Sequence, residues 1–186
     1  GFGFRPIKKI AQNYNNAALS EYNVAASSAL ISHACLVQLT ADGVVLASGN
    51  TTTNNLGTLN GVFYTDATSN KPTFSNFSPA SNTATDIVAF INDDPMQMFE
   101  VMSADTAFNQ NEVGHLADQV LEVGTTPLFV SKSKISATTA TTQAQLFIMG
   151  VSRDPDHSDT TAEGFALRVQ IREHILIGND TQRAGI

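Results

Sequence analysis

The sequence contains a single cysteine, Cys35, and no tryptophan, and only 15% of its 186 residues are charged. One cysteine excludes a disulfide within the chain and any zinc or iron–sulfur site built from several cysteines. No apolar run approaches 18 residues, so no membrane-spanning helix is expected. The 10 Lys and Arg residues stand against 17 Asp and Glu, a formal net charge of −7. This balance argues against sequence-independent binding of nucleic acid, which needs a basic surface.

Uncharged polar residues replace the missing charges. Charged residues usually make up about 25% of a soluble domain, and here Ser, Thr and Asn take their place. Thr favours strands and Asn favours turns, so we expect a β-rich protein. The length is that of one domain with a sizeable core. An apolar content of 42% with so few charges favours a homo-oligomer, and we expect a trimer.

Apolar segments of strand length recur within residues 27–186, the expected body of the protein. A turn at Asp42-Gly43 between two β-branched runs predicts a hairpin over residues 35–47. Strict alternation over residues 165–172 predicts a strand with one core face and one face toward water or a partner. Its core face carries Phe165, Leu167, Val169 and Ile171. Further strands are expected at 61–65, 86–92, 97–102, 128–130 and 145–151. The spacing predicts a mainly β fold, an antiparallel β-barrel or sandwich.

The stretch 103–142 is expected to be more irregular than the rest of the body. It contains one apolar stripe at helical spacing, formed by Val113, Leu116, Ala117, Val120 and Leu121. Because Gly124 is a stop signal, we expect one short helix within residues 106–122. The Ser-, Thr- and Ala-rich tract 136–142 is expected to be a surface loop.

Residues 1–26 have no sustained strand or helix period and mix basic with aromatic residues. Apolar side chains that such a segment cannot bury by itself are expected to dock on a neighbouring subunit. We therefore predict an extended N-terminal arm. Its candidate partner-binding residues are Phe2, Phe4, Arg5, Ile7, Lys8, Lys9 and Tyr14. A terminal strand lying on its own domain is the alternative.

The polar loop at residues 66–85 contains two aromatic residues, Phe74 and Phe77. Aromatic residues in such a loop indicate that it packs on something, either its own body or a neighbour. Both residues are therefore candidate partner-binding residues.

No residue pattern predicts a catalytic, cofactor-binding or metal site. The four histidines stand apart, without the close pair common in zinc sites; they are His33, His115, His157 and His174. The neighbours Asp93 and Asp94 form a turn, where adjacent carboxylates normally diverge into water. Cys35 lies in an apolar strand and is expected to be a buried, inert thiol.

The densest group of carboxylates is Asp154, Asp156 and Asp159. Alternating carboxylates could bind calcium. An EF-hand loop starting at Asp154 would need Gly at its sixth position and Glu at its twelfth, where this chain has Asp159 and Phe165. We interpret the segment as a solvated turn between strands, with calcium binding as the open alternative.

Several short motifs resemble small structural proteins of tailed bacteriophages, especially marine ones. They are GFRPIKKI at residues 3–10 with QNYNN at 12–16, GVFYTD at 61–66 with KPTFS at 71–75, and QLF, RDPD and VQIREH between 145 and 174. The chain is similar to head decoration or cement proteins, which sit on the outside of the icosahedral capsid and clamp neighbouring major capsid subunits. The resemblance implies a β-barrel or β-tulip-like body, often trimeric, with an extended arm. The chain is longer than the small lambda-type decoration proteins, the excess lying at 103–142.

The resemblance implies a virion protein on the outer capsid surface, with the major capsid protein as partner and without enzymatic activity or a cofactor. A protein that acts by multivalent placement gains avidity from geometry and needs no strong single site. Composition adds the expectation of no nucleic-acid or membrane contact. Two alternatives stay open. One is another virion part, a tail or connector protein; the other is an enzyme or carbohydrate-binding β-domain, against which the lack of tryptophan argues.

Overall fold

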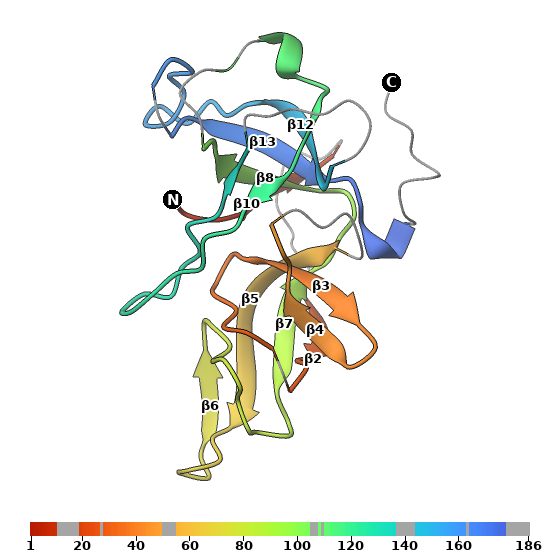
Figure 1. Ribbon diagram of the computed structural model, residues 1–186, viewed down its shortest axis with the longest axis vertical. Helices are drawn as coiled ribbons and strands as arrows, with labels where there is room; N and C mark the ends of the chain where they lie inside the picture. Colours follow the sequence, from red (N-terminus) through yellow and green to blue (C-terminus); the bar gives the residue numbers. More distant parts are fainter. Residues whose placement is uncertain are drawn as a thin grey trace.

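The structure is a computed structural model, and it describes residues 1–10, 19–26, 28–49, 55–104, 108, 110–136, 144–162 and 164–177. Two large antiparallel sheets follow one another along the longest axis of the molecule (Figure 1). The mainly β, antiparallel fold is thereby confirmed. A sandwich-like arrangement fits the described residues, and no closed barrel forms among them.

The upper sheet in Figure 1 has five strands in the order β1-β8-β13-β12-β9. They are β1 (Arg5–Lys9), β8 (Gln97–Met102), β13 (Ala166–Ile171), β12 (Leu146–Val151) and β9 (Leu116–Ala117). The predicted strand near the C-terminus is confirmed as β13. Its predicted core residues, Phe165, Leu167, Val169 and Ile171, are all buried. The opposite face was expected to be exposed to water or to a partner. It is partly buried, because Gln170 and Arg172 are buried as well.

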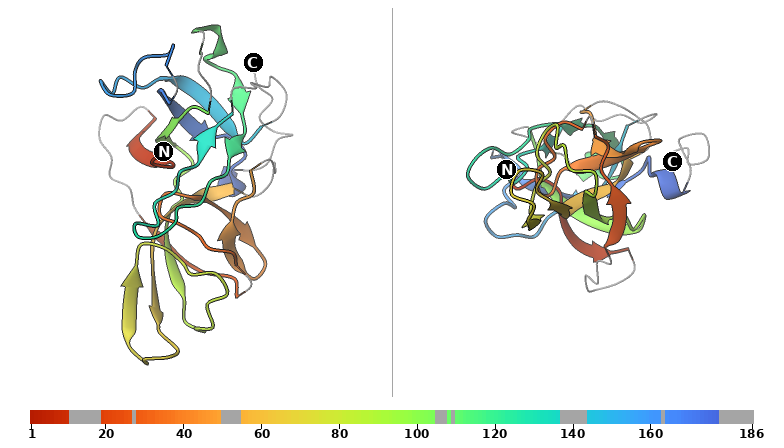
Figure 2. Two further views of the ribbon diagram at one scale, coloured as in Figure 1. Left: turned by 60° about the vertical axis from the view of Figure 1, so that its left-hand side comes forward. Right: turned by 90° about the horizontal axis from the view of Figure 1, so that it is seen from below.

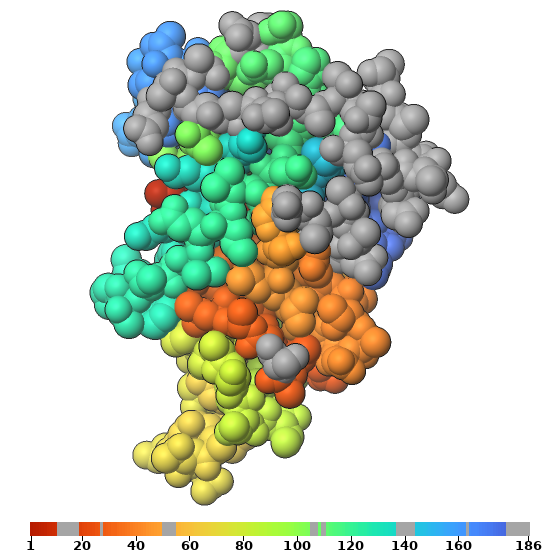
Figure 3. Space-filling view, viewed as in Figure 1, coloured from red at the N-terminus to blue at the C-terminus, as the bar shows by residue number. Residues whose placement is uncertain are grey.

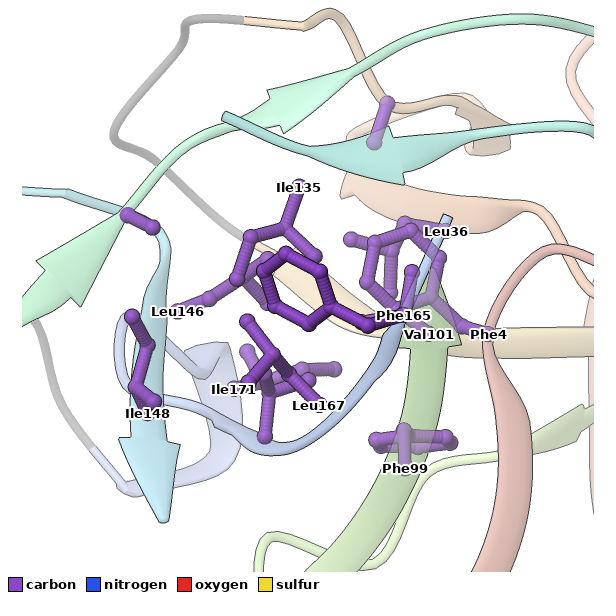
Figure 4. Close-up of a cluster of buried hydrophobic side chains, with 13 residues drawn as sticks. Phe4, Leu36, Phe99, Val101, Ile135, Leu146, Ile148, Phe165, Leu167 and Ile171 are labelled. Atoms are coloured by element: carbon purple, nitrogen blue, oxygen red, sulfur yellow. The ribbon is translucent and has the colours of Figure 1, made fainter. Parts of the chain in front are cut away.

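Segments from distant parts of the chain fill the core of the upper sheet. Figure 4 shows Phe4, Leu36 and Phe165 gathered beside one another, although they come from different regions of the sequence. Burying a large apolar side chain contributes about 1.5–3 kcal/mol, so this cluster ties the N-terminal segment to the last strand. The other members are Ala47, Phe99, Val101, Ala117, Ile135, Leu146, Ile148, Leu167, Val169 and Ile171.

The lower sheet has six strands, five of them in the order β2-β7-β5-β3-β4. They are β2 (Ser20–Asn23), β7 (Val88–Asn92), β5 (Asn55–Thr65), β3 (Leu36–Thr40) and β4 (Gly43–Leu46), and β6 (Pro72–Ser75) pairs with β5. The predicted hairpin is confirmed as β3–β4, and Gly43 has a φ of 125°, which favours glycine. The β5–β6 hairpin projects from the end of the molecule (Figures 1 and 2).

The predicted helix within residues 106–122 is wrong. That region contains the short 3-10 turn η1 (Gln110–Glu112), followed by β9 and by β10 (Gln119–Val120), which pairs with β11 (Lys134–Ile135). The stripe residues Leu116 and Ala117 are buried as an edge strand against β12. The open edge of β12 supplies backbone partners that a helix would not use, and such tertiary pairing overrides helical spacing.

The remaining described helical segment is η2 (Ile175–Ile177), which follows the upper sheet. All but the first residue of the predicted 136–142 loop lies outside the described residues. Within the described ranges, no helix is long and apolar enough to cross a membrane.

Candidate functional site

The described part of residues 1–26 is built into the body, so the prediction of an arm that leaves it is corrected. β1 pairs with β8 in the upper sheet, and β2 pairs with β7 in the lower sheet. Phe4 is fully buried, and its backbone N–H donates to the carbonyl of Ala34 over 2.9 Å. Two sheet edges offer unpaired backbone groups, and the core accepts an aromatic ring that a lone segment could not bury. The alternative of terminal strands on their own domain therefore holds here.

Arg5 binds acids of its own chain. Its Nε donates to Oε2 of the buried Glu100 over 2.9 Å, and Nη2 donates to Oδ2 of Asp154 over 3.3 Å. The hydrogen bond to Glu100 is the main cause that raises the pKa of Arg5 above its ordinary value. The guanidinium carbon also lies 4.7 Å from the ring centroid of Phe2, which meets His157 edge-on. These two predicted partner-binding residues are thus engaged internally.

The remaining described partner-binding residues predicted in the N-terminal segment also belong to the body of the protein. Lys9 forms an ion pair with Asp94. Burial acts to raise the pKa of Asp94, but hydrogen bonds from Lys9 and from the Met96 backbone outweigh it, so this pKa lies below its ordinary value. Ile7 and Lys8 are half-buried in β1. The remaining predicted contact, Tyr14, lies outside the described residues.

The two aromatic residues predicted in the 66–85 loop have different environments. Phe77 stacks on Phe129, with ring centroids 3.8 Å apart and ring planes 13° from parallel. Phe74 contacts Phe63 across the β5–β6 hairpin at 4.7 Å, yet it is 77% exposed. The loop therefore packs on its own body through Phe77 and offers Phe74 to its surroundings.

Leu128, in the loop between β10 and β11, is the second large apolar side chain exposed near this hairpin, at 70%. Its carbonyl accepts a hydrogen bond of 2.8 Å from Nδ2 of Asn76, just after β6. This bond and the Phe77–Phe129 stack join the two segments, which lie on the same side of the molecule in Figure 3. We call Phe74 and Leu128, together with the stacked pair Phe77 and Phe129 on the same two segments, the apolar patch.

Phe129 has a φ of 48°, which is rare for a bulky residue. Such a conformation costs on the order of 1–3 kcal/mol and tends to occur at functional sites. The Phe77 stack and a hydrogen bond of 3.0 Å from the Phe129 N–H to the Thr125 carbonyl hold it. The predicted strand 128–130 is therefore wrong: Pro127 lacks an N–H for pairing, and only Val130 of the three forms a bridge, to His33.

The acidic residues considered for chemistry serve local structure. Oδ1 of Asp154 accepts the backbone N–H of Asp156 over 3.1 Å, the main cause that lowers the pKa of Asp154. Oδ2 of Asp93 accepts from the Tyr22 hydroxyl over 2.6 Å. Burial is the main cause that raises the pKa of Tyr22 to about 12. Within the described ranges, no three His, Cys, Asp or Glu side chains are placed to hold a metal ion.

Cys35 is buried, and burial raises the pKa of its thiol, in keeping with the prediction of an inert group. Sequence reasoning identified Phe74 and Phe77 but missed Leu128 and Phe129. The signal available was the Thr-Thr-Pro segment before Leu128, which favours a turn over a strand. Comparisons with protein-family models, with curated proteins and with solved structures find no match to this chain.

Proposed function

We propose that this chain is a virion structural protein that binds the outer surface of a phage capsid and holds neighbouring major capsid subunits together. The observation that carries the proposal is the apolar patch, in which Phe74 and Leu128 are 77% and 70% exposed. Single exposed apolar residues are common on protein surfaces. Two of them on segments joined by a stacked aromatic pair and a hydrogen bond are typical of an interaction surface.

The sequence resemblance supports the capsid as the partner. Two of the motifs that resemble phage structural proteins, residues 61–66 and 71–75, lie almost wholly in the β5–β6 hairpin that carries Phe63 and Phe74. The hairpin projects beyond the rest of the lower sheet (Figure 1), so its tip can reach a flat or concave surface without obstruction. The proposed contact therefore moves from the N-terminal segment to this hairpin and the β10–β11 loop.

The energy available from the patch favours an oligomer. Burying Phe74 and Leu128 contributes about 1.5–3 kcal/mol each, less than the cost of holding one protein on another. Several patches on one oligomer would add avidity through geometry. A homo-oligomer, with a trimer favoured, thus belongs to the proposal, and no enzymatic step is needed.

Co-sedimentation tests the capsid proposal. Capsids of the phage that encodes the chain, stripped of the protein, are mixed with wild type, Phe74→Ser or Leu128→Ser. Each variant should fold as wild type does but sediment with capsids at least about 10-fold more weakly, as expected for the loss of one buried apolar side chain. Leu176→Ser is the matched control, because Leu176 is 52% exposed in η2, away from the hairpin in Figure 1. Equal binding by all four proteins would contradict the proposal.

Light scattering tests the oligomer. The free protein, or the protein released from particles, should have the mass of a trimer. A monomer bound singly to the capsid, without contact between copies, would contradict this part of the proposal.

A further inference from the structure

A surface cleft of about 440 Å³ is lined by residues of β12 and β13. These strands belong to the upper sheet in Figure 1, whereas the β5–β6 hairpin is at the opposite end of the molecule. The lining of the cleft includes Arg153, Arg168 and Ser158. Among the residues that the structure describes, neither arginine forms an ion pair. In a chain with a net charge of −7 and 10 basic residues, two arginines left without acidic partners in one cleft form an uncommon local excess of positive charge.

Two acids beside these arginines bind other groups: Glu100, the register partner of Arg168, and Asp154, which follows Arg153 in the chain. Arg5, Glu100 and Arg168 stand opposite one another on the neighbouring strands β1, β8 and β13. Oε2 of Glu100 accepts from Arg5, and its Oε1 accepts from the Ser152 hydroxyl. Asp154 likewise binds Arg5 over 3.3 Å. Arg5 and Ser152 therefore occupy both carboxylate oxygens of Glu100, and among the described residues no ion pair joins Glu100 to Arg168.

The backbone beside Arg168 is shaped to leave room for its guanidinium. The β12–β13 register shifts between Ile148 and Gly150, and Gly150, opposite Arg168, has a φ of 150°. A Cβ at Gly150 would lie 3.1 Å from Nη2 of Arg168. Such bulges often re-aim side chains next to functional sites. The Nε of Arg168 is buried and has no hydrogen-bond partner within the described part of the chain, and an unsatisfied charged donor is costly.

We propose that this cleft binds a phosphate group through Arg153 and Arg168. The planar guanidinium forks match the oxygens of an oxyanion, and two positive charges favour a phosphate dianion over a singly charged carboxylate. The hydroxyl of Ser158 supplies a further donor on the same lining. A phosphate in the cleft would supply the anionic partner that, among the described residues, no ion pair gives to Arg153 or Arg168. The site is independent of capsid binding.

Calorimetric titration with inorganic phosphate tests the site on the full chain, with ionic strength held constant by chloride. Wild type should bind one phosphate per chain, and the melting temperature should rise with phosphate concentration, because a ligand that binds only the folded state stabilises it. Arg168→Gln and Arg153→Gln should each weaken binding at least about 10-fold, the expected loss of a charge-assisted hydrogen bond. Lys71→Gln, which removes one positive charge in the β5–β6 turn, should bind like wild type.

Two further ligands identify the chemistry. A nucleoside monophosphate that binds more tightly than inorganic phosphate would assign the site to a phosphoryl group on a larger molecule, and equal or weaker binding would assign it to free phosphate. Acetate, a singly charged carboxylate, should bind more weakly than phosphate. The proposal is overturned if phosphate causes no more heat or stabilisation than chloride, if acetate binds equally well, or if the arginine variants bind like Lys71→Gln.

Discussion

Nε of Arg5 and Oε2 of Glu100, 95 positions apart in the chain, form a hydrogen bond of 2.9 Å that joins the first strand to its neighbour β8. Glu100 is 4% exposed, and the side chain of Arg5 is 50% exposed. The buried carboxylate thus depends on a partner at the edge of the sheet. The N-terminal segment is held by this charge pairing as well as by the packing of Phe4.

Replacing Arg5 with Gln should lower the free energy of unfolding by about 2 kcal/mol, because Glu100 would be left buried with an unpaired charge. Solvent screening at the half-exposed Arg5 keeps the loss below that of a fully buried pair. Urea denaturation measures it. Adding Glu100→Gln in the Arg5→Gln background should restore part of the loss in a double-mutant cycle. Lys132→Gln, at an exposed position, is the charge-matched control, and an equal stability of Arg5→Gln and this control would refute the prediction.

Lowering the pH below about 6.5 should destabilise the protein through His174. Burial is the main cause that lowers its pKa below the ordinary 6.5, against the opposing effect of Asp93. Its Nδ1 accepts the Leu176 N–H over 3.2 Å, which favours the neutral ring. Because the unfolded chain takes up this proton first, the free energy of unfolding is greatest above pH 6.5 and falls as the pH drops toward the folded-state pKa. Urea denaturation from pH 7.5 to 5.5 should show a smaller decline for His174→Asn; an identical decline would refute the assignment.

Val169→Asp should cost several kcal/mol, because it places a carboxylate without a partner in the core of the upper sheet. Val120→Asp is the matched control, since Val120 is 44% exposed in β10, and it should change stability by about 0.5 kcal/mol at most. Urea denaturation compares the two variants. If Val169→Asp does not fold, Val169→Ala should still cost about 2 kcal/mol. Equal stabilities for the two aspartate variants would contradict the observed register of β13.

Phe77→Ala should lower the free energy of unfolding by about 2 kcal/mol through loss of the stack on Phe129 and of buried area. It should also speed amide exchange in residues 121–133, because Phe129 would lose the contact that offsets its strained backbone. Hydrogen exchange and urea denaturation measure the two effects. Phe74→Ala, at the exposed ring, should change neither by a comparable amount. Equal effects of the two substitutions would show that the stack does not support the loop.

Local signals in the sequence predicted the β structure where neighbouring residues decide the conformation. Alternation identified β13 and its buried residues, and the Asp42-Gly43 turn identified the β3–β4 hairpin. Both depend on short-range physics, namely the two-residue period of a strand and the turn preference of glycine. The same reasoning placed Phe74 and Phe77 on a loop that packs on something, without naming the contact.

Tertiary structure alone decided the elements whose partners lie far along the chain. The apolar residues at 113–121 are compatible with a helix and with an edge strand. Pairing with the open edge of β12 makes Leu116 and Ala117 a strand. Residues 1–10 lack a period of their own, yet β8 and the core around Phe165 bind them in place. Likewise, Phe77 is half-buried in its stack on Phe129, whereas Phe74 is exposed. The loop that carries Phe129 comes from a segment about 50 positions further along the chain, where Leu128 accepts a hydrogen bond from Asn76. Such choices depend on which open edge or uncovered surface another segment supplies, and local sequence does not encode that.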